Sequence, residues 1–219
     1  MNIYELEKCK MSCALAYALG LIFPLYKVKP LEGKEYILGS INHNSGKITQ
    51  DEINQHYEKV FKLFKEDLGN EKIQINANKT NYYNLTNKEG FSILIEKLNV
   101  SKEDCVNILT EKTNEIKNST EKIKAEFVKG CFDGRSSWDK TAHYLSIDVD
   151  RDYNKQDIII EIIESVGIDI NNNRRDINHE KNDQLRIKYE SLPTFMSKIG
   201  FYSSCRNSIV KHAMNELER

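Results

Sequence analysis

The sequence predicts an α+β protein in which the unit αββαββα occurs twice. Three observations predict it. Only three prolines and ten glycines interrupt 219 residues, so regular structure should dominate. Helical and strand patterns alternate in the same order in both halves of the chain. The residues that end the helices also align in order between the halves, as Gly20 with Gly130, Leu68-Gly69 with Val166-Gly167, and Leu98-Asn99 with Ile199-Gly200.

The composition is that of a globular protein and limits its partners. Hydrophobic residues make up 39% of the chain and charged residues 30%, and no apolar run reaches the ~18 residues of a membrane span. The 32 basic and 33 acidic residues give a net charge of −1, which excludes nucleic-acid binding by bulk charge but leaves room for a local basic face. Five cysteines without a CxxC pair argue against disulfides and zinc, so we expect a cytoplasmic protein.

The first expected element is a helix over Tyr4–Ile22, which Pro24 ends because proline cannot continue a helix. Its small residues recur every three or four positions, which puts them on one stripe and lets another backbone approach closely. We therefore expect Ala16 and Gly20, together with Gly130 of the second half, to lie at a helix interface.

The remaining elements of the first half follow in order. Leu25–Lys29 and Glu35–Asn42 read as strands, and Thr49 with Glu52 forms a capping box that opens an amphipathic helix. We expect two short strands at Lys72–Ala77 and Tyr82–Leu85 and a short helix at Phe91–Leu98. A polar helical connector is expected at Ser101–Ser119.

The second half repeats the pattern. It opens with a helix over Glu121–Phe132 that carries Gly130. We expect a strand pair at Ser136–Asp139 and His143–Val149, followed by an isoleucine-rich helix at Lys155–Val166. Two further strands are expected at Ile168–Asp176 and Gln184–Tyr189, then a short helix at Leu192–Ile199 and a final amphipathic helix at Asn207–Leu217.

The stretch from Phe127 to Ser137 (FVKGCFDGRSS) resembles the signature helix of the LAGLIDADG homing endonucleases, and Leu19–Leu25 (LGLIFPL) resembles a decayed first copy. The resemblance implies that two αββαββα units pack through these helices while antiparallel sheets form a saddle over the DNA major groove. The expected domains are an N-terminal repeat over residues 1–100, a helical connector over 101–120, and a C-terminal repeat plus final helix over 121–219.

The resemblance also implies an acidic residue at the eighth motif position, binding a divalent metal beside a scissile phosphate. Hard oxygen ligands suit Mg²⁺, the cofactor we expect. With Gly130 as the motif glycine, however, the sixth position is Asp133 and the eighth is Arg135. In the first copy the sixth is Phe23 and the eighth is Leu25. Neither copy keeps the acid.

Three interpretations of this departure stay open. In the first, the site has moved: Asp133 and Asp139 bind the metal, with Asp148 or Asp150 as further ligands, and Arg135 holds phosphate. In the second, catalysis is lost, and Arg135, Ser136 and Ser137 contact backbone phosphates. In the third, the junction is a local capping turn with Trp138 packed beside it.

The expected strands carry side chains suited to reading DNA. Arg186 and Lys188 share one strand face, as do Lys27 with Lys29 and Gln74 with Asn76. Arginine, asparagine and glutamine make bidentate contacts to purine edges, although outward polar residues can also be merely solvated. The predicted DNA-binding residues are Lys27, Lys29, Gln74, Asn76, Ser136, Ser137, Arg174, Arg175, Arg186 and Lys188.

The leading functional hypothesis is a metal-dependent, sequence-specific endonuclease of double-stranded DNA, of homing or restriction type. Asp133, Asp139 and Arg135 would be its catalytic residues, Asp133 and Asp139 its metal ligands. The alternative is a catalytically inactive DNA-binding protein or transcription regulator, which the missing motif acids favour. A protein–protein module is the third hypothesis. We expect no membrane partner and a monomer, with a homodimer as the alternative.

Overall fold

The computed structural model describes residues 1–43, 49–68, 74–76, 89–139, 142–173 and 182–217. The first half contains, in chain order, α1 (Ile3–Lys8), α2 (Cys13–Ile22), β1 (Val28–Leu31), β2 (Lys34–His43), α3 (Gln50–Leu68), β3 (Gln74–Asn76), β4 (Glu89–Glu96) and α4 (Lys102–Lys117). The second half contains α5 (Glu121–Arg135), β5 (Ser136–Asp139), β6 (Tyr144–Val149), α6 (Tyr153–Glu164), β7 (Ile170–Asn173), β8 (Asp183–Ile187), a 3₁₀ turn, α7 (Leu192–Lys198) and α8 (Ser204–Leu217).

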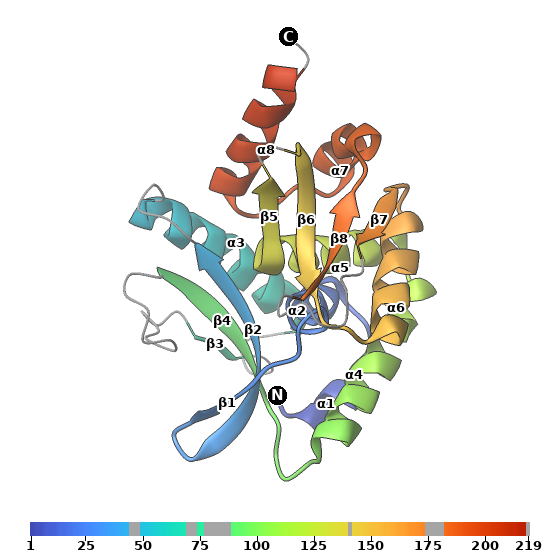
Figure 1. Ribbon diagram of the computed structural model, residues 1–219. Helices are drawn as coiled ribbons and strands as arrows, with labels where there is room; N and C mark the ends of the chain where they lie inside the picture. The colour runs from blue at the N-terminus through green and yellow to red at the C-terminus, as the bar shows by residue number, and fades with distance from the viewer. Residues whose placement is uncertain (44–48, 69–73, 77–88, 140–141, 174–181, 218–219) are drawn as a thin grey trace.

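The described strands form two antiparallel sheets of matching topology. The first has the strand order β1-β2-β4-β3 and the second the order β5-β6-β8-β7. From α2 and from α5 the chain therefore runs through the same series, αββαββα, with α4 as the last helix of the first series and α7 of the second. The predicted α+β fold of two pseudo-symmetric repeats is confirmed. Figure 1 shows the sheets side by side, with the strands of the second sheet in front of α5.

The single helix expected over Tyr4–Ile22 is two helices. Asn2 and Glu5 form a capping box at the start of α1, and α1 ends at Cys9, whose backbone is extended. Ser12 then caps α2 by accepting a hydrogen bond from the Leu15 amide at 3.3 Å. The polar run between the helices and the serine before Cys13 are the sequence signals of this break.

The helix expected over Phe91–Leu98 is wrong, because these residues belong to strand β4. β4 lies between β2 and β3, and every side chain from Phe91 to Ile95 is buried. A strand buried on both faces has a continuous apolar run instead of an alternating one, so its sequence can resemble a buried helix. The strand expected at Tyr82–Leu85 lies outside the described residues.

The polar segment after β4 forms the expected helix, α4. Its Cys105, Leu109 and Ile116 are buried in the main core. The helix packs against α1, α2, α5 and α6. None of the described helices is long and apolar enough to cross a membrane.

Candidate nucleic-acid interface

The two central helices, α2 and α5, touch backbone to backbone. A Cβ atom added at Gly20 would lie 2.1 Å from the Phe127 carbonyl oxygen, and one added at Gly130 would lie 2.3 Å from the Tyr17 carbonyl oxygen. Both distances are far below any real contact, so only glycine fits at either position. Ala16 is also fully buried, in the core that both helices share.

The carboxyl end of α2 carries no acidic side chain. Phe23, Pro24 and Leu25 follow one another there, and the Pro24 carbonyl accepts a hydrogen bond from the Asp150 amide at the end of β6, at 2.8 Å. Lys155, the nearby cation, is buried beside the Phe23 ring and ion-paired with Asp150. The charges at this end therefore balance within the chain.

The carboxyl end of α5 is basic and polar. Arg135 is the last helical residue and is half-buried, and Ser136 follows as the C-cap. The guanidinium of Arg206, from α8, donates from Nη1 to the Ser136 carbonyl at 2.8 Å and also to the Ser136 hydroxyl. A cation that hydrogen-bonds the end of a helix also interacts favourably with the helix dipole.

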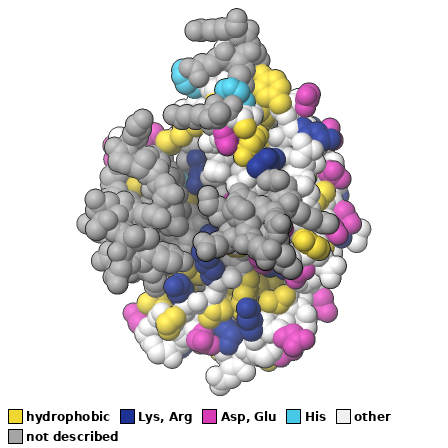
Figure 2. All heavy atoms as spheres, viewed as in Figure 1, with side chains coloured by type: hydrophobic (Ala, Val, Ile, Leu, Met, Phe, Trp, Pro, Cys, Tyr) yellow, Lys and Arg dark blue, Asp and Glu magenta, His cyan; other side chains and the backbone are white. Residues whose placement is uncertain are grey.

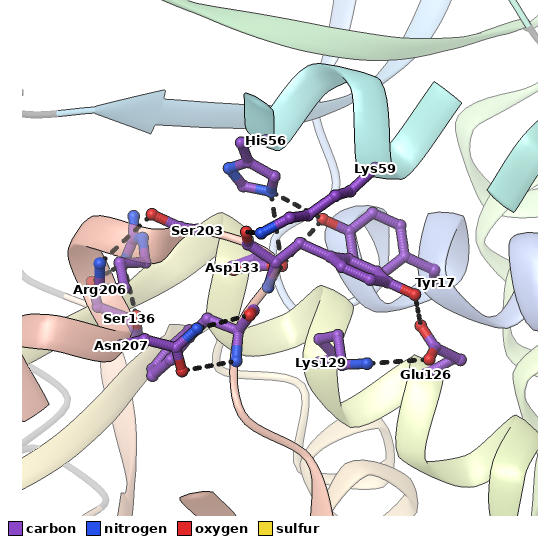
Figure 3. Close-up of polar contacts among 12 residues, drawn as sticks. Tyr17, His56, Lys59, Glu126, Lys129, Asp133, Ser136, Ser203, Arg206 and Asn207 are labelled. Atoms are coloured by element: carbon purple, nitrogen blue, oxygen red, sulfur yellow. Dashed lines mark hydrogen bonds and ion pairs between the residues drawn. The ribbon is translucent and has the colours of Figure 1, made fainter. Parts of the chain in front are cut away.

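Asp133, one turn before the end of α5, is the centre of a buried polar network (Figure 3). Its Oδ2 accepts hydrogen bonds from the Tyr17 hydroxyl at 3.0 Å and from the Tyr202 amide at 3.1 Å, and lies 3.5 Å from Nε2 of His56. Tyr17 belongs to α2, His56 to α3, and Tyr202 to the segment before α8. The carboxylate thus joins three parts of the chain to α5.

The network continues from Tyr202 towards α5. The Tyr202 hydroxyl donates to Glu126 at 2.9 Å, and Lys129 donates to the same carboxylate at 2.9 Å while its Nζ lies 4.3 Å from the Tyr202 ring centroid. Lys59 of α3 donates to the Tyr202 carbonyl at 3.1 Å. Figure 3 shows these side chains converging from α2, α3, α5 and the C-terminal segment.

These surroundings set the ionisation of the central groups. Burial by itself raises the pKa of Asp133, but its interactions with His56 and Arg206 and its hydrogen bond from Tyr202 outweigh burial and lower the pKa. Burial and the adjacent Asp133 carboxylate raise the pKa of Tyr17 well above its usual value. Asp133 is therefore a charged acceptor and Tyr17 a neutral donor at neutral pH.

The predicted metal ligands gain no partners that would complete a metal site. Oδ1 of Asp133 is enclosed and accepts no hydrogen bond from the described residues. Asp139, at the other end of β5, is half-buried and accepts a hydrogen bond from the Ala142 amide at 2.8 Å. The described part of the chain holds no group of three or more His, Cys, Asp or Glu side chains able to bind a metal ion. Its residues do not fit a divalent metal at the ends of α2 and α5.

The second sheet has one apolar and one polar face. Leu145, Ile147 and Leu185 alternate into the core, whereas the residues between them point to the opposite side. Strand register places these opposite residues beside one another. The described side chains of the polar face of the second sheet are those of Ser137, Asp139, Tyr144, Ser146, Asp148, Asn171, Gln184 and Arg186.

Hydrogen bonds connect much of this polar face. Ser137 and Ser146 share a hydrogen bond at 3.1 Å. Nε2 of Gln184 donates to Asp148 at 3.2 Å, and Nη2 of Arg186 donates to Oε1 of Gln184 at 3.2 Å. In Figure 2, lysine and arginine side chains lie along the middle of the molecular face that carries the strands.

The corresponding face of the first sheet is less polar in its described part. Lys29 pairs with Tyr36 in the register of β1 and β2, and Ser40 hydrogen-bonds Ser92 at 3.3 Å across β2 and β4. Between these polar pairs, Leu38 opposes Leu94. Lys27 precedes β1 and is half-buried.

The other predicted contact residues are less fully described. Gln74 and Asn76 belong to β3, where their backbones pair with Leu94 and Ser92, but their side chains lie outside the described atoms. Arg174 and Arg175 lie outside the described residues. Lys188 follows β8 and is exposed.

Sequence reasoning missed the partners of Asp133. The members of this network are far apart in the sequence. Tyr17 lies 39 residues from His56 and 116 from Asp133, and Tyr202 lies 69 residues from Asp133, with Arg206 beyond it. No local spacing in the sequence therefore predicts these contacts. The one available signal was Tyr17, whose hydroxyl needs a partner in an otherwise apolar helix.

No family model and no curated protein sequence matches the chain. Among solved structures, a variant of the homing endonuclease I-DmoI aligns with a TM-score of 0.53 and 20% identity, over 87% of this chain and 96% of that one. I-DmoI in complex with DNA and Mn gives 0.53 and 19%, over 87% and 98%. Full-length DUF199/WhiA from Thermatoga maritima gives 0.51 and 14%, over 98% of this chain and 65% of that one.

The repeated element order, the two matched sheets and the glycine contact between α2 and α5 agree with these structural neighbours. Together they show that the chain has a LAGLIDADG-like fold, similar to that of I-DmoI.

Proposed function

We propose that this chain binds double-stranded DNA across the polar faces of its sheets and does not cut it with metal at the ends of α2 and α5. The observation that carries the proposal is the polar face of the second sheet, where arginine, glutamine and asparagine side chains stand opposite a buried, mainly apolar face. These are the side chains that recognise base edges. I-DmoI, of similar fold, has been crystallised with DNA.

The helix ends support binding without cleavage. I-DmoI was crystallised with Mn, Ca and Mg, but here the end of α2 has no acid and the end of α5 has Arg135. Asp133 is held by Tyr17 and Tyr202 in the interior. A metal-dependent endonuclease activity remains a prediction, with Mg²⁺ as cofactor and Asp133, Asp139 and Arg135 as catalytic residues. The contacts of Asp133 do not favour it.

Within the binding function, Arg135 is well placed to contact backbone phosphate beside Ser136 and Ser137. Lys27, Lys29, Lys188, Arg174 and Arg175 would add backbone contacts. Each such cation releases counterions on binding, so affinity should fall steeply with salt despite a net charge of −1. A monomeric state, a cytoplasmic location and the domain limits at residues 100 and 120 stay part of the proposal, with α4 both completing the first αββαββα series and linking it to the second.

A selection from random duplexes followed by gel shifts tests this function. Binding that weakens with salt, has the same Kd in EDTA and in Ca²⁺ at matched ionic strength, and gives no cleaved product in Mg²⁺ or Mn²⁺ would support it. Cleaved product would establish the endonuclease instead. Contacts to phosphate are strongest at low salt, so absence of any shift at about 20 to 50 mM salt would refute DNA binding.

Two matched lysine variants locate the interface. Lys29→Ala should make the negative slope of log affinity against log salt shallower by about 0.9, as expected for one lost phosphate contact. Lys62→Ala should leave it unchanged, because Lys62 is 76% exposed on α3 and pairs with Glu66. Equal effects of the two variants would contradict binding along the sheets.

A further inference from the structure

Arg186 is held in one orientation by two neighbours on the polar face of the second sheet, Tyr144 and Gln184. Its guanidinium carbon lies 4.1 Å from the centroid of the Tyr144 ring. Its Nη2 donates to Gln184 at 3.2 Å, and Gln184 in turn donates to Asp148 at 3.2 Å. Stacking on Tyr144 fixes the plane of the guanidinium, and the hydrogen bonds from Arg186 to Gln184 and from Gln184 to Asp148 fix its orientation within that plane.

Such an arrangement is preorganised for a planar acceptor. An ordered arginine has already lost much of the side-chain entropy that a free one would lose on binding. Arginine carries five N–H donors, and the described contacts name an acceptor for Nη2. The Nε donor is buried and has no hydrogen-bond partner among the described residues. Because Nε is enclosed, the donors offered to a ligand are those of the terminal nitrogens, of which the described contacts name an acceptor for Nη2 alone.

The neighbouring side chains indicate a base edge and not a phosphate as that ligand. Asp148 is a carboxylate on the same face, linked to Arg186 through Gln184, and it would repel a phosphate brought to this point. In the strand register, Ser146 and Asn171 lie on either side of Arg186. Both are neutral. Ser146 is buried and hydrogen-bonded to Ser137, whereas Asn171 is exposed, so a flat group would reach Arg186 from the Asn171 side.

We propose that Arg186 reads one guanine in the major groove and so determines sequence specificity at one base pair. A guanine presents O6 and N7 as adjacent acceptors, which match two donors of a fixed guanidinium. The inference rests on the proposed DNA binding and deepens it. Tyr144, Gln184 and Asp148 are positioning residues that act through Arg186.

The test compares base-preference profiles of the wild type and of variants, obtained by selection from random duplexes. The wild type should prefer guanine about ten- to hundredfold at one position. Arg186→Ala should lose that preference, and Arg186→Lys should lose most of it while keeping the salt dependence of binding, because lysine keeps the charge without the planar fork. Circular dichroism melting checks that each variant folds.

Two further variants separate reading from general binding. Gln184→Ala should weaken the guanine preference with Arg186 still present. Lys188→Ala, two residues along the chain and exposed, should weaken binding to all sequences equally. A guanine preference that survives in Arg186→Lys and Arg186→Ala, in proteins that still bind DNA, would overturn the inference. A wild type that binds no DNA would overturn the proposed function as well.

Discussion

At the scale of single residues, burial determines what the Asp133 carboxylate does. An acid in a polar junction sequence resembles a metal ligand, but Asp133 is fully enclosed and hydrogen-bonded to Tyr17 and Tyr202. A buried charge without partners is very costly, so a carboxylate enclosed in this way is bound to the groups that compensate it. Asp133 therefore holds helices together instead of facing a ligand.

Replacing Asp133 with asparagine should destabilise the fold strongly. The variant removes the charge that faces His56 and Arg206 while keeping the size of the side chain. Loss of one partner in a buried charged network typically costs about 3 to 5 kcal/mol. Urea unfolding should show this loss, whereas Asp139→Asn, which removes the charge but keeps an oxygen that can accept from the Ala142 amide, should cost about 1 kcal/mol or less. Equal losses would refute the structural role.

The same network predicts a pH dependence. The folded pKa of Asp133 lies below its value of 3.8 in an unfolded chain. The group therefore contributes stability that is fully present above pH 3.8 and is lost as pH falls through the lower folded pKa. The gap in unfolding free energy between wild type and Asp133→Asn should be constant from pH 5 to 7, roughly, and narrow below about pH 4. A gap that widens on acidification would contradict the lowered pKa.

At the scale of elements, the contact between α2 and α5 depends on missing side chains. Each of the two glycines faces the carbonyl of the other helix at a distance that excludes a methyl group. A backbone obstacle cannot rotate away as a side chain can, so a methyl group here must push the helices apart.

Gly130→Ala should therefore cost more stability than Gly134→Ala in the same helix. At Gly130 the new Cβ would lie 2.3 Å from the Tyr17 carbonyl oxygen, but at Gly134 it would meet the end of the Leu21 side chain at 2.8 Å. Overpacking commonly costs about 1 to 3 kcal/mol, and we expect Gly130→Ala at or above the top of that range. Thermal melting of both variants gives the comparison, and a lower melting point for Gly134→Ala would contradict it.

The elements also show where sequence reasoning succeeds. Strand β6 could be predicted because its apolar residues Leu145, Ile147 and Val149 alternate with more polar ones. β4 could not, because both of its faces are buried. The polar face of the second sheet was likewise predictable from alternation in β8. The network around Asp133 was not, because its members meet only in three dimensions.

At the scale of the whole molecule, the C-terminal segment connects the two repeats. Tyr202 and Arg206 come from the end of the chain, yet Tyr202 receives a hydrogen bond from Lys59 of the first repeat and donates one to Asp133 of the second. The Tyr202 ring also lies against that of Tyr17, with centroids 5.3 Å apart. The last helix is part of the structural core in this sense.

A chain ending at Gly200 should consequently lose stability in its first repeat. Without Tyr202 and Arg206, Asp133 loses its backbone donor and a compensating charge. Hydrogen exchange should show reduced protection in α3, and fluorescence of the single tryptophan, Trp138, should report a lower urea midpoint. A chain ending at Leu217 is the control, and unchanged exchange in α3 after the longer truncation would refute the connection.

The two helix backbones touch at Gly20 and Gly130, and at this point the repeats cannot tilt or slide without a clash between backbone atoms. The angle between the two strand surfaces is thus set before any ligand arrives. In the proposed complex, a duplex laid across them would have to bend or twist to suit the protein, so base steps that deform easily, such as TA and CA, should be favoured even where no side chain touches them.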